Sequence, residues 1–197
     1  MLDYLVQLDI ALLEWIHVHL HSGWSDAIIP WLRNKYVWIP LYVFIISFML
    51  MNFKSKGWIW VLLVLFGVGL ADSISSKAFK YNVKRLRPCH TEVVQDNIDL
   101  LVPCGGKYSF TSNHAANHFA IAFFIFFTLG GMYRWVRWPA VIWAALVSFA
   151  QVYVGVHYPL DVIGGCLIGL VIGASLAWYF NRRWGFNETL VLADSNS

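Results

Sequence analysis

Long apolar stretches dominate this chain and alternate with short polar segments. Five of the stretches reach or approach the roughly 20 apolar residues that a helix needs to cross the hydrocarbon core of a bilayer. We place the predicted spans at residues 37–53, 58–78, 116–132, 139–156 and 160–180.

The N-terminal stretch, residues 2–21, has a different pattern, because acids and histidines interrupt its apolar positions. Apolar residues such as Leu13 and Ile16 recur at helical spacing, which predicts an amphipathic helix lying in the membrane interface within residues 1–25. A first transmembrane span, giving six in all, is the alternative interpretation. The interrupting residues are Asp3, Asp9, Glu14, His17, His19 and His21.

Composition supports an integral membrane protein. Of the 197 residues, 59% are hydrophobic and 13% are charged, about half the charged fraction of roughly 25% in soluble domains. The mean hydropathy is +0.59. A soluble fold of this size could not bury so much apolar surface, and a disordered chain would be far more polar. The net charge of +3 is too small to indicate a nucleic-acid partner, so the expected surroundings are membrane lipids.

The chain shows no internal repeat and no break in composition, so we predict one membrane-embedded domain over residues 1–197. Its predicted fold class is all-α, a bundle of about five transmembrane helices plus the amphipathic N-terminal helix. Residues 187–197 are polar and are expected to form a loose tail.

Pairs of lysine and arginine flank the ends of several predicted spans. Such residues concentrate on the cytoplasmic side of membrane proteins, and with five spans all of these pairs share one side. The opposite side then receives the N-terminal helix, the loop from about residue 80 to 115, and the turn around His157. The pairs are Lys54 and Lys56, Arg134 and Arg137, and Arg182 and Arg183.

Three short polar groups lie on this outer side, and the first has four cations within eight residues, from Lys80 to Arg87. Such a cluster beside lipid could bind anionic headgroups or place its charges at the interface. However, Pro88 favours an extended backbone at Arg87. A guanidinium held in that way suits bidentate binding of a phosphate.

The second group, residues 111–114, directly precedes the third span. Ser112 is a natural N-cap, so the following backbone amides point outward from a helix N-terminus. Such an end attracts anions, and His114 would lie beside an anion bound there. A capped helix with an interfacial histidine is the simpler interpretation of this group taken alone.

The third group, from His157 to Asp161, starts the last span. Pro159 suits a first helical turn. A carboxylate four residues after a histidine can accept the imidazole N–H and fix the tautomer. The other ring nitrogen is then free to act as a nucleophile or a base. This spacing alone is weak evidence, because many proteins contain it by chance.

Together, the cations, the helix end and the two histidines predict a phosphoryl-transfer site, because the topology brings all three groups to one face. In their order and spacing they resemble the type 2 phosphatidic acid phosphatase (PAP2) superfamily, whose motifs are K-x6-R-P, P-S-G-H and S-R-x5-H-x3-D. The resemblance covers about residues 58–180, the expected catalytic core. The matching positions are Lys80, Arg87, Pro88, Ser112, His114, His157 and Asp161.

The resemblance implies a mechanism without metal or other cofactor. His157 would attack phosphorus and form a phosphohistidine, Asp161 would orient it, and His114 would protonate the leaving oxygen and later activate water. The phosphate oxygens would be held by Lys80, Arg87, Ser112 and the backbone amide of Asn113, with Gln151 at the position of the motif arginine.

The resemblance also implies the class of substrate. We expect a lipid phosphate at the outer leaflet of a bacterial inner membrane, with the active site facing the periplasm. Undecaprenyl diphosphate is the first candidate, and phosphatidylglycerol phosphate, phosphatidic acid and lipid A are alternatives. A non-catalytic protein that binds or carries lipid phosphates is an alternative from another functional class.

Gln151 departs from the family pattern, because the third motif has arginine there, and Ala150 replaces the preceding serine. Glutamine can donate a hydrogen bond but brings no charge, and a charge-assisted bond is roughly twice as strong as a neutral one. Either Lys84 or Arg85 compensates, or turnover is slow, or the substrate differs; we hypothesise compensation, because the first motif carries these extra cations.

Two further sites concern cysteine and histidine. Cys89 and Cys104 lie in the outer loop, where a periplasmic location would permit a disulfide; two free thiols are the alternative. His114 and His118 share a helical face and could form half of a zinc site, but nothing nearby completes the ligand set. We therefore predict a disulfide, no metal site, and a hydrogen-bonded structural role for His118.

Overall fold

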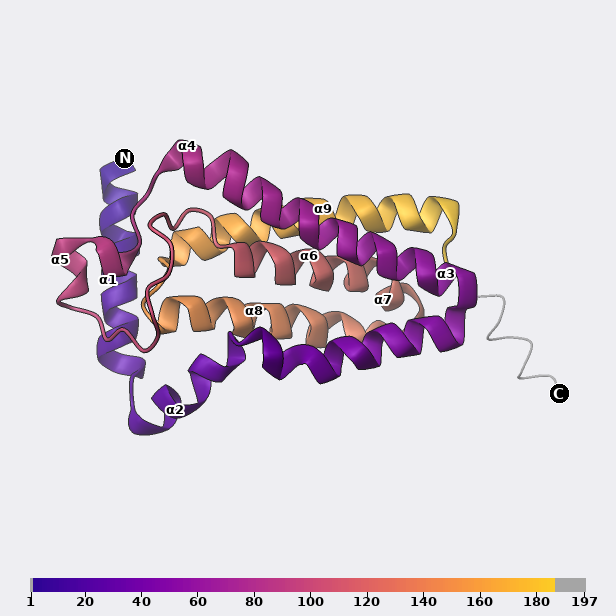
Figure 1. Ribbon diagram of the computed structural model, residues 1–197, viewed down its shortest axis with the longest axis horizontal. Helices are drawn as coiled ribbons and strands as arrows, with labels where there is room; N and C mark the ends of the chain where they lie inside the picture. Colours follow the sequence, from indigo (N-terminus) through magenta and orange to yellow (C-terminus); the bar gives the residue numbers. More distant parts are fainter. Residues whose placement is uncertain (1, 187–197) are drawn as a thin grey trace.

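The computed structural model describes residues 2–186, and the regular elements in this range are helical (Figure 1). The predicted loose tail, residues 187–197, lies outside the described residues. The elements are α1 (Leu2–Leu20), α2 (Gly23–Leu32), η1 (Lys35–Trp38), α3 (Ile39–Ser73), η2 (Ile74–Lys80), α4 (Tyr81–Val83), η3 (Pro88–His90), α5 (Glu92–Gln95), α6 (Asn113–Phe127), α7 (Leu129–Met132), η4 (Arg134–Val136), α8 (Arg137–Tyr153) and α9 (Pro159–Arg183).

Four helical segments are long and apolar enough to cross a membrane, and the first, Lys35–Val83, has 49 residues. That is more than twice the length of one crossing. The chain reverses at Lys54, where φ is 47°, and Figure 1 shows the two arms of α3 running antiparallel. A side chain at Gly57 would collide with the carbonyl of Met49, so glycine permits the close approach of the arms. The arms correspond to the predicted spans 37–53 and 58–78.

Helix α6 is the most buried of these segments and packs against α9 along a stripe of glycines. A Cβ atom at Gly165, Gly169 or Gly173 would lie 2.5–2.7 Å from backbone atoms of α6 or of its N-cap residue. Glycine at every fourth position therefore lets the two helix backbones touch, as in many membrane helix pairs. The close contact places the N-termini of α6 and α9 side by side at one end of the bundle (Figure 1).

Helix α1 lies across that same end, roughly perpendicular to the bundle (Figure 1). Its inner face buries Leu13 and Ile16 against the turn between α8 and α9. Its outer face leaves Leu8, Leu12 and Trp15 exposed. An exposed apolar face on a helix across the bundle end fits the interfacial helix that the sequence predicts.

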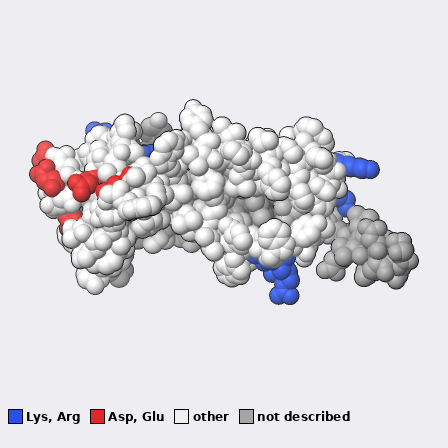
Figure 2. Space-filling view, turned by 90° about the horizontal axis from the view of Figure 1, so that it is seen from below, with Lys and Arg blue, Asp and Glu red and all other residues white. Residues whose placement is uncertain are grey.

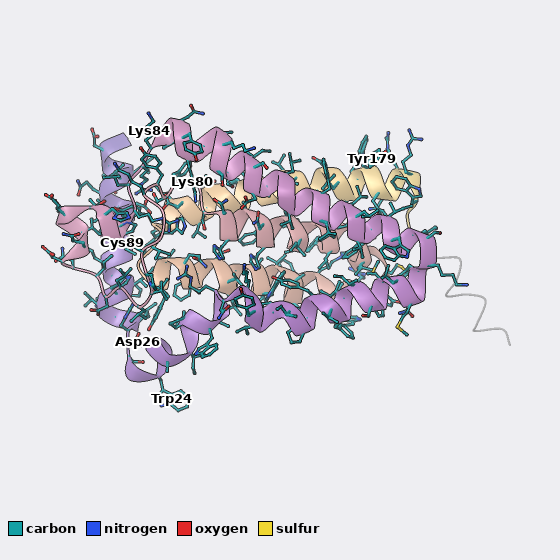
Figure 3. All side chains as sticks on the ribbon, viewed as in Figure 1. Trp24, Asp26, Lys80, Lys84, Cys89 and Tyr179 are labelled. Carbon is teal, nitrogen blue, oxygen red and sulfur yellow. A yellow bond between two sulfur atoms is a disulfide. The ribbon has the colours of Figure 1, made fainter. Side chains whose placement is uncertain are left out.

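The long segment 84–112 also covers this end, where Figure 3 labels Lys80, Lys84 and Cys89; Tyr179 marks the opposite end. Two stretches of the segment pair in antiparallel fashion, since Arg87 N–H donates to Lys107 O at 3.2 Å and Ser109 N–H donates to Arg85 O at 2.8 Å. Cys89 and Cys104 form a disulfide that closes the segment. This end of the bundle is therefore covered by an ordered loop that lies over the N-termini of α6 and α9.

Charge divides the two ends of the bundle. On the face in Figure 2, aspartate and glutamate gather at the end that carries α1 and α5, beside some lysine and arginine, and among the described residues only lysine and arginine colour the other end. The helix surfaces between the ends carry exposed apolar side chains such as Phe44, Leu65 and Leu167. This arrangement is the one expected of a bundle that meets lipid along its sides.

Candidate active site

The predicted site residues come together at the capped end of the bundle. Lys80 ends η2, Arg87 lies in the paired part of the loop, and Ser112 caps α6. His157 lies in the turn between α8 and α9, and Asp161 in the first turn of α9. Four separate parts of the chain thus supply the site.

His157 and Asp161 form an oriented pair. The Asp161 Oδ2 atom lies 3.3 Å from His157 Nδ1 and accepts the Tyr158 N–H at 2.9 Å, so the carboxylate is held from two sides. Both side chains are buried. Burial lowers the pKa of His157 to about 4, against the opposing effect of Asp161. The imidazole is therefore neutral near pH 7, with Nδ1 carrying the proton that Asp161 accepts.

Arg87 faces the other side of the imidazole. Its backbone is extended, with φ −71° and ψ 155°, which confirms the expectation drawn from Pro88. The Nη1 atom donates to Val156 O at 3.0 Å and lies 3.4 Å from His157 Nε2. Its Nε atom is buried without a hydrogen-bond partner among the described residues. The lone pair of Nε2 therefore points at a fixed guanidinium with donor capacity to spare.

The N-terminus of α6 forms a third side. Ser112 is the N-cap, as predicted, with its Oγ accepting the Ala115 N–H at 3.5 Å. Ser112 N–H donates to Asp161 O at 3.0 Å, which ties this helix start to the first turn of α9. The first amides of a helix have no intrahelical acceptor, so this end can bind an anion. The Thr111 hydroxyl is also buried, with no partner in residues 2–186.

The Asn113 side chain points away from this anion site. Its Nδ2 donates to Asp72 Oδ1 at 2.6 Å and to Ser76 Oγ at 2.7 Å, both on the helix that leads to Lys80. Only the backbone amide of Asn113 is left for a phosphate oxygen, as the family resemblance implies. Asp72 is exposed, so it does not lie inside the bundle as a carboxylate at membrane depth would be expected to, and the Asn113 amide is its polar neighbour.

His118 is a hydrogen-bonded structural residue, as predicted. Its Nδ1–H donates to His114 O at 2.8 Å, and its Nε2 accepts from the Tyr42 hydroxyl at 3.2 Å. Both ring nitrogens are thus in use one turn below His114. Across residues 2–186, no group of three or more His, Cys, Asp or Glu is placed to hold a metal ion.

Gln151 is buried at the outer end of α8. Its Nε2 turns back towards Val147 O at 3.5 Å, and its Oε1 has no partner within the described part of the chain. The hypothesis that Lys84 or Arg85 compensates for the lost guanidinium stays a prediction, and the surroundings of the two side chains give it little support. The Arg85 guanidinium is bound to two carboxylates, and the Lys84 side chain is exposed.

Arg33 is a cation near the site that the sequence did not reveal. It follows α2, is half-buried, and takes part in none of the ion pairs found between residues 2 and 186. Burial lowers the pKa of Arg87, and the neighbouring charge of Arg33 adds to this lowering while Asp161 opposes it. In the sequence Arg33 looks like any cation flanking a span, so no local signal distinguishes it.

Asp9 is a further site residue that sequence reasoning missed, and Arg85 makes contacts that the sequence did not predict. Arg85 contacts both Asp9 and Asp161, with distances of 2.6 and 3.1 Å. Signals for both were present: Asp9 lies on the same helical face as Leu13 and Ile16, and Arg85 is two residues before Arg87. Alternate residues of an extended segment share a face, so the two arginines point the same way.

Comparison with known families gives a match to the PAP2 superfamily over residues 57–185. The chain is 31% identical to a lipid A 4'-phosphatase of Bacteroides thetaiotaomicron over 172 residues, covering 86% of this chain and 75% of the relative. It is 35% identical to an undecaprenyl-diphosphatase of Sulfolobus acidocaldarius over 137 residues, covering 69% of this chain and 60% of the relative.

The fold is also similar to that of a solved PAP2-type phosphatase. The crystal structure of a transmembrane PAP2-type phosphatidylglycerolphosphate phosphatase from Bacillus subtilis superposes with a TM-score of 0.66 at 25% identity, covering 92% of this chain and 88% of that one. The predicted fold class, an all-α helical membrane protein, is therefore confirmed.

Proposed function

The chain belongs to the PAP2 superfamily of membrane phosphatases, and from this premise we propose that it removes a phosphate group from a membrane lipid through a covalent phosphohistidine on His157. The observation that carries the proposal is the state of this imidazole. It is buried and neutral, its Nδ1 is held by Asp161, and its Nε2 faces Arg87. A nucleophile oriented in this way has no use in a protein that only binds lipid.

The proposed reaction has two steps. In the first, His157 Nε2 attacks phosphorus, the P–N bond forms, and the P–O bond to the lipid breaks as protonated His114 gives its proton to the leaving oxygen. In the second, His114 takes a proton from water, which attacks phosphorus and breaks the P–N bond to release inorganic phosphate. Lys80, Arg87 and the amides at the start of α6 would hold the phosphate oxygens throughout.

We propose that Arg33 supplies the guanidinium charge that Gln151 lacks. Trp38 lies edge-on against Trp143 of α8, and its indole N–H donates to Leu32 O at 2.7 Å, which fixes the chain beside Arg33. Gln151 is eight residues further along α8, about 12 Å towards the outer end at 1.5 Å per residue. Arg33 precedes Trp38 on a path antiparallel to α8, and its charge acts on Arg87, so we infer that it lies towards the Gln151 end of α8.

For the substrate, we propose a lipid-borne phosphate monoester of the lipid A type, with undecaprenyl diphosphate as the second candidate. This reverses the order expected from the sequence. The reason is coverage, because the similarity to the lipid A 4'-phosphatase extends over 86% of this chain and the similarity to the undecaprenyl-diphosphatase over 69%. A site at the bundle end suits both substrates, since their tails remain in the bilayer while the phosphate meets the cations.

We also propose that the active-site end faces the periplasm of a bacterial inner membrane. Two features support this orientation. At the opposite end, the charged residues that Figure 2 colours are lysine and arginine, as expected of a cytoplasmic side, within the described part of the chain. The Cys89–Cys104 disulfide lies on the active-site side, and disulfides persist in oxidising compartments such as the periplasm.

The test is phosphate release by purified protein, without added metal, from lipid A, undecaprenyl diphosphate, phosphatidylglycerol phosphate and phosphatidic acid. We expect lipid A to have the highest kcat/KM, EDTA to leave the rate unchanged, and His157→Ala to abolish turnover. His90→Ala is the matched control, because His90 is an exposed histidine of the covering loop. Acid-labile phosphate should become bound to the wild-type protein and not to His157→Ala.

Two outcomes would contradict the proposal. Turnover that survives His157→Ala would remove the assigned nucleophile. Tight binding of all four lipids with no phosphate release from any of them would favour the alternative, a carrier of lipid phosphates. A higher kcat/KM for undecaprenyl diphosphate than for lipid A would leave the mechanism in place and restore the substrate order expected from the sequence.

A further inference from the structure

A second layer of charged residues lies behind the His157–Asp161 pair. Arg85 Nη1 donates to Asp161 Oδ1 at 3.1 Å, the carboxylate oxygen that His157 does not use. Arg85 Nη2 donates to Asp9 Oδ2 at 2.6 Å, and its guanidinium stacks on the ring of Tyr158 at 3.8 Å. One guanidinium is thus shared between the catalytic carboxylate and an acid of helix α1.

Asp9 is itself built into the fold. It is 3% exposed, and its second oxygen, Oδ1, accepts the Leu160 N–H at 2.8 Å, in the first turn of α9. Burial raises the pKa of Asp9, and the bonds from Leu160 and Arg85 oppose that rise. A carboxylate on the inner face of an amphipathic helix is costly to bury, and an apolar residue would pack there without that cost. The presence of Asp9 at this position therefore calls for an explanation beyond packing.

Charge counting suggests that explanation. If Arg85 faced Asp161 alone, its positive charge would cancel much of the carboxylate's negative charge, and Asp161 would polarise His157 less strongly. With Asp9 on its other side, Arg85 forms a neutral pair with Asp9. Asp161 then keeps a net negative charge directed at the imidazole, which becomes positively charged as the phosphohistidine forms.

We propose that Asp9 and Arg85 are positioning residues of the active site: Arg85 holds Asp161 in place, and Asp9 balances the charge of Arg85 so that Asp161 continues to act on His157. The inference rests on the proposed role of His157 as nucleophile. It gives the interfacial helix α1 a part in the chemistry, because Asp9 reaches the site only when α1 lies across the bundle end. Neither residue is a fixed position of the motifs that identify the family, since Arg85 is one of the six variable residues of the first motif and Asp9 lies outside all three.

The test compares Asp9→Asn, Arg85→Gln and the double variant with wild type. Asp3→Asn is the control, because Asp3 is an exposed acid on the same helix. Asp9→Asn leaves Arg85 unbalanced, so kcat should fall about 10- to 100-fold, the usual loss when a group that orients an active-site ligand is removed, with KM nearly unchanged. The double variant removes both charges, so its kcat should exceed that of Asp9→Asn.

A second readout does not depend on turnover. The pKa of His157 can be followed by NMR of histidine-labelled protein in detergent micelles, with Lys80 and Arg87 unchanged in every variant. It should fall in Asp9→Asn, rise in Arg85→Gln, and return towards the wild-type value in the double variant. This pattern follows from charge alone and would not arise if the residues only anchored α1.

The outcomes separate the inference from the proposed function. Lack of turnover of every lipid phosphate by wild type would refute the proposed function, and the NMR titration would still decide the charge balance. Normal kcat and an unshifted His157 in Asp9→Asn, as in Asp3→Asn, would overturn the inference. So would a double variant with kcat no higher than Asp9→Asn and no return of the His157 pKa.

Discussion

Arg33 offers the sharpest test of how this chain functions without the motif arginine. The change is Arg33→Gln, which removes the charge and keeps a polar side chain of similar shape. Lys35→Gln is the matched control, because Lys35 is an exposed cation two residues away. If Arg33 binds the phosphate, the first variant should lose activity and the second should not.

The expected size follows from the contact that is lost. A hydrogen bond to a charged group contributes about 1.5–3 kcal/mol when it is removed from one side. That range corresponds to a loss of roughly 10- to 150-fold in kcat/KM. The upper part of the range applies here, because Arg33 is half-buried and the phosphate would bind among buried groups, where solvent screens charge weakly.

The assay is phosphate release under kcat/KM conditions in detergent micelles that contain the lipid substrate. Arg33→Lys is a second variant, and it should recover part of the activity because it restores charge without the bidentate fork. Placing arginine at the motif position, as Gln151→Arg, should make the further loss of Arg33 smaller. Equal kcat/KM for Arg33→Gln and Lys35→Gln would refute the compensation.

Two other predictions concern stability. His157 has a folded-state pKa of about 4 and an ordinary value of 6.5, so between these pH values the unfolded chain binds a proton that the folded protein does not. The free energy of unfolding should therefore fall as pH drops from 6.5 towards 4, by up to about 3 kcal/mol in total. In thermal unfolding, His157→Asn should remove this part of the pH dependence. Equal pH dependence in the wild type and the variant would contradict the prediction. Gly169→Ala puts a methyl group 2.7 Å from the Ala116 carbonyl and should cost about 1–3 kcal/mol in thermal unfolding, with a loss of kcat because the two helix ends separate. Gly69→Ala has no atom within 4 Å and should be neutral or slightly stabilising, and equal destabilisation by both would show that the glycine stripe is unimportant.

Local rules predicted much of the site from the sequence. Ser112 caps α6 because its hydroxyl can accept from its own helix, and Pro159 begins α9 because a first turn tolerates the missing N–H. His157 and Asp161 meet across a single helical turn. Each of these features depends on residues within four positions of one another, so the sequence contains the information directly.

The contacts that were missed join residues far apart in the chain. Arg85 and Asp9 are separated by 76 residues and meet only because the outer loop pairs with itself and α1 crosses the bundle end. The side chain of Asn113 turns to Asp72 for the same kind of reason, across the contact between two spans. Motif spacing therefore predicted that His157 and Asp161 meet, but could not say which cation faces which carboxylate.

The cations around His157 do two things that depend on each other. Arg87 and Lys80 both lower the pKa of His157, after burial, so the same charges that would hold a phosphate also keep Nε2 unprotonated before the lipid arrives. A bound phosphate brings negative charge that offsets theirs, which favours the positive charge developing on the imidazole as the P–N bond forms. Removing a cation would reduce its repulsion of a positively charged His157, but it would not improve the enzyme. The imidazole would then be easier to protonate before the lipid binds, and the phosphate would be harder to bind. This coupling explains why an uncharged Gln151 calls for a replacement charge nearby rather than for fewer cations.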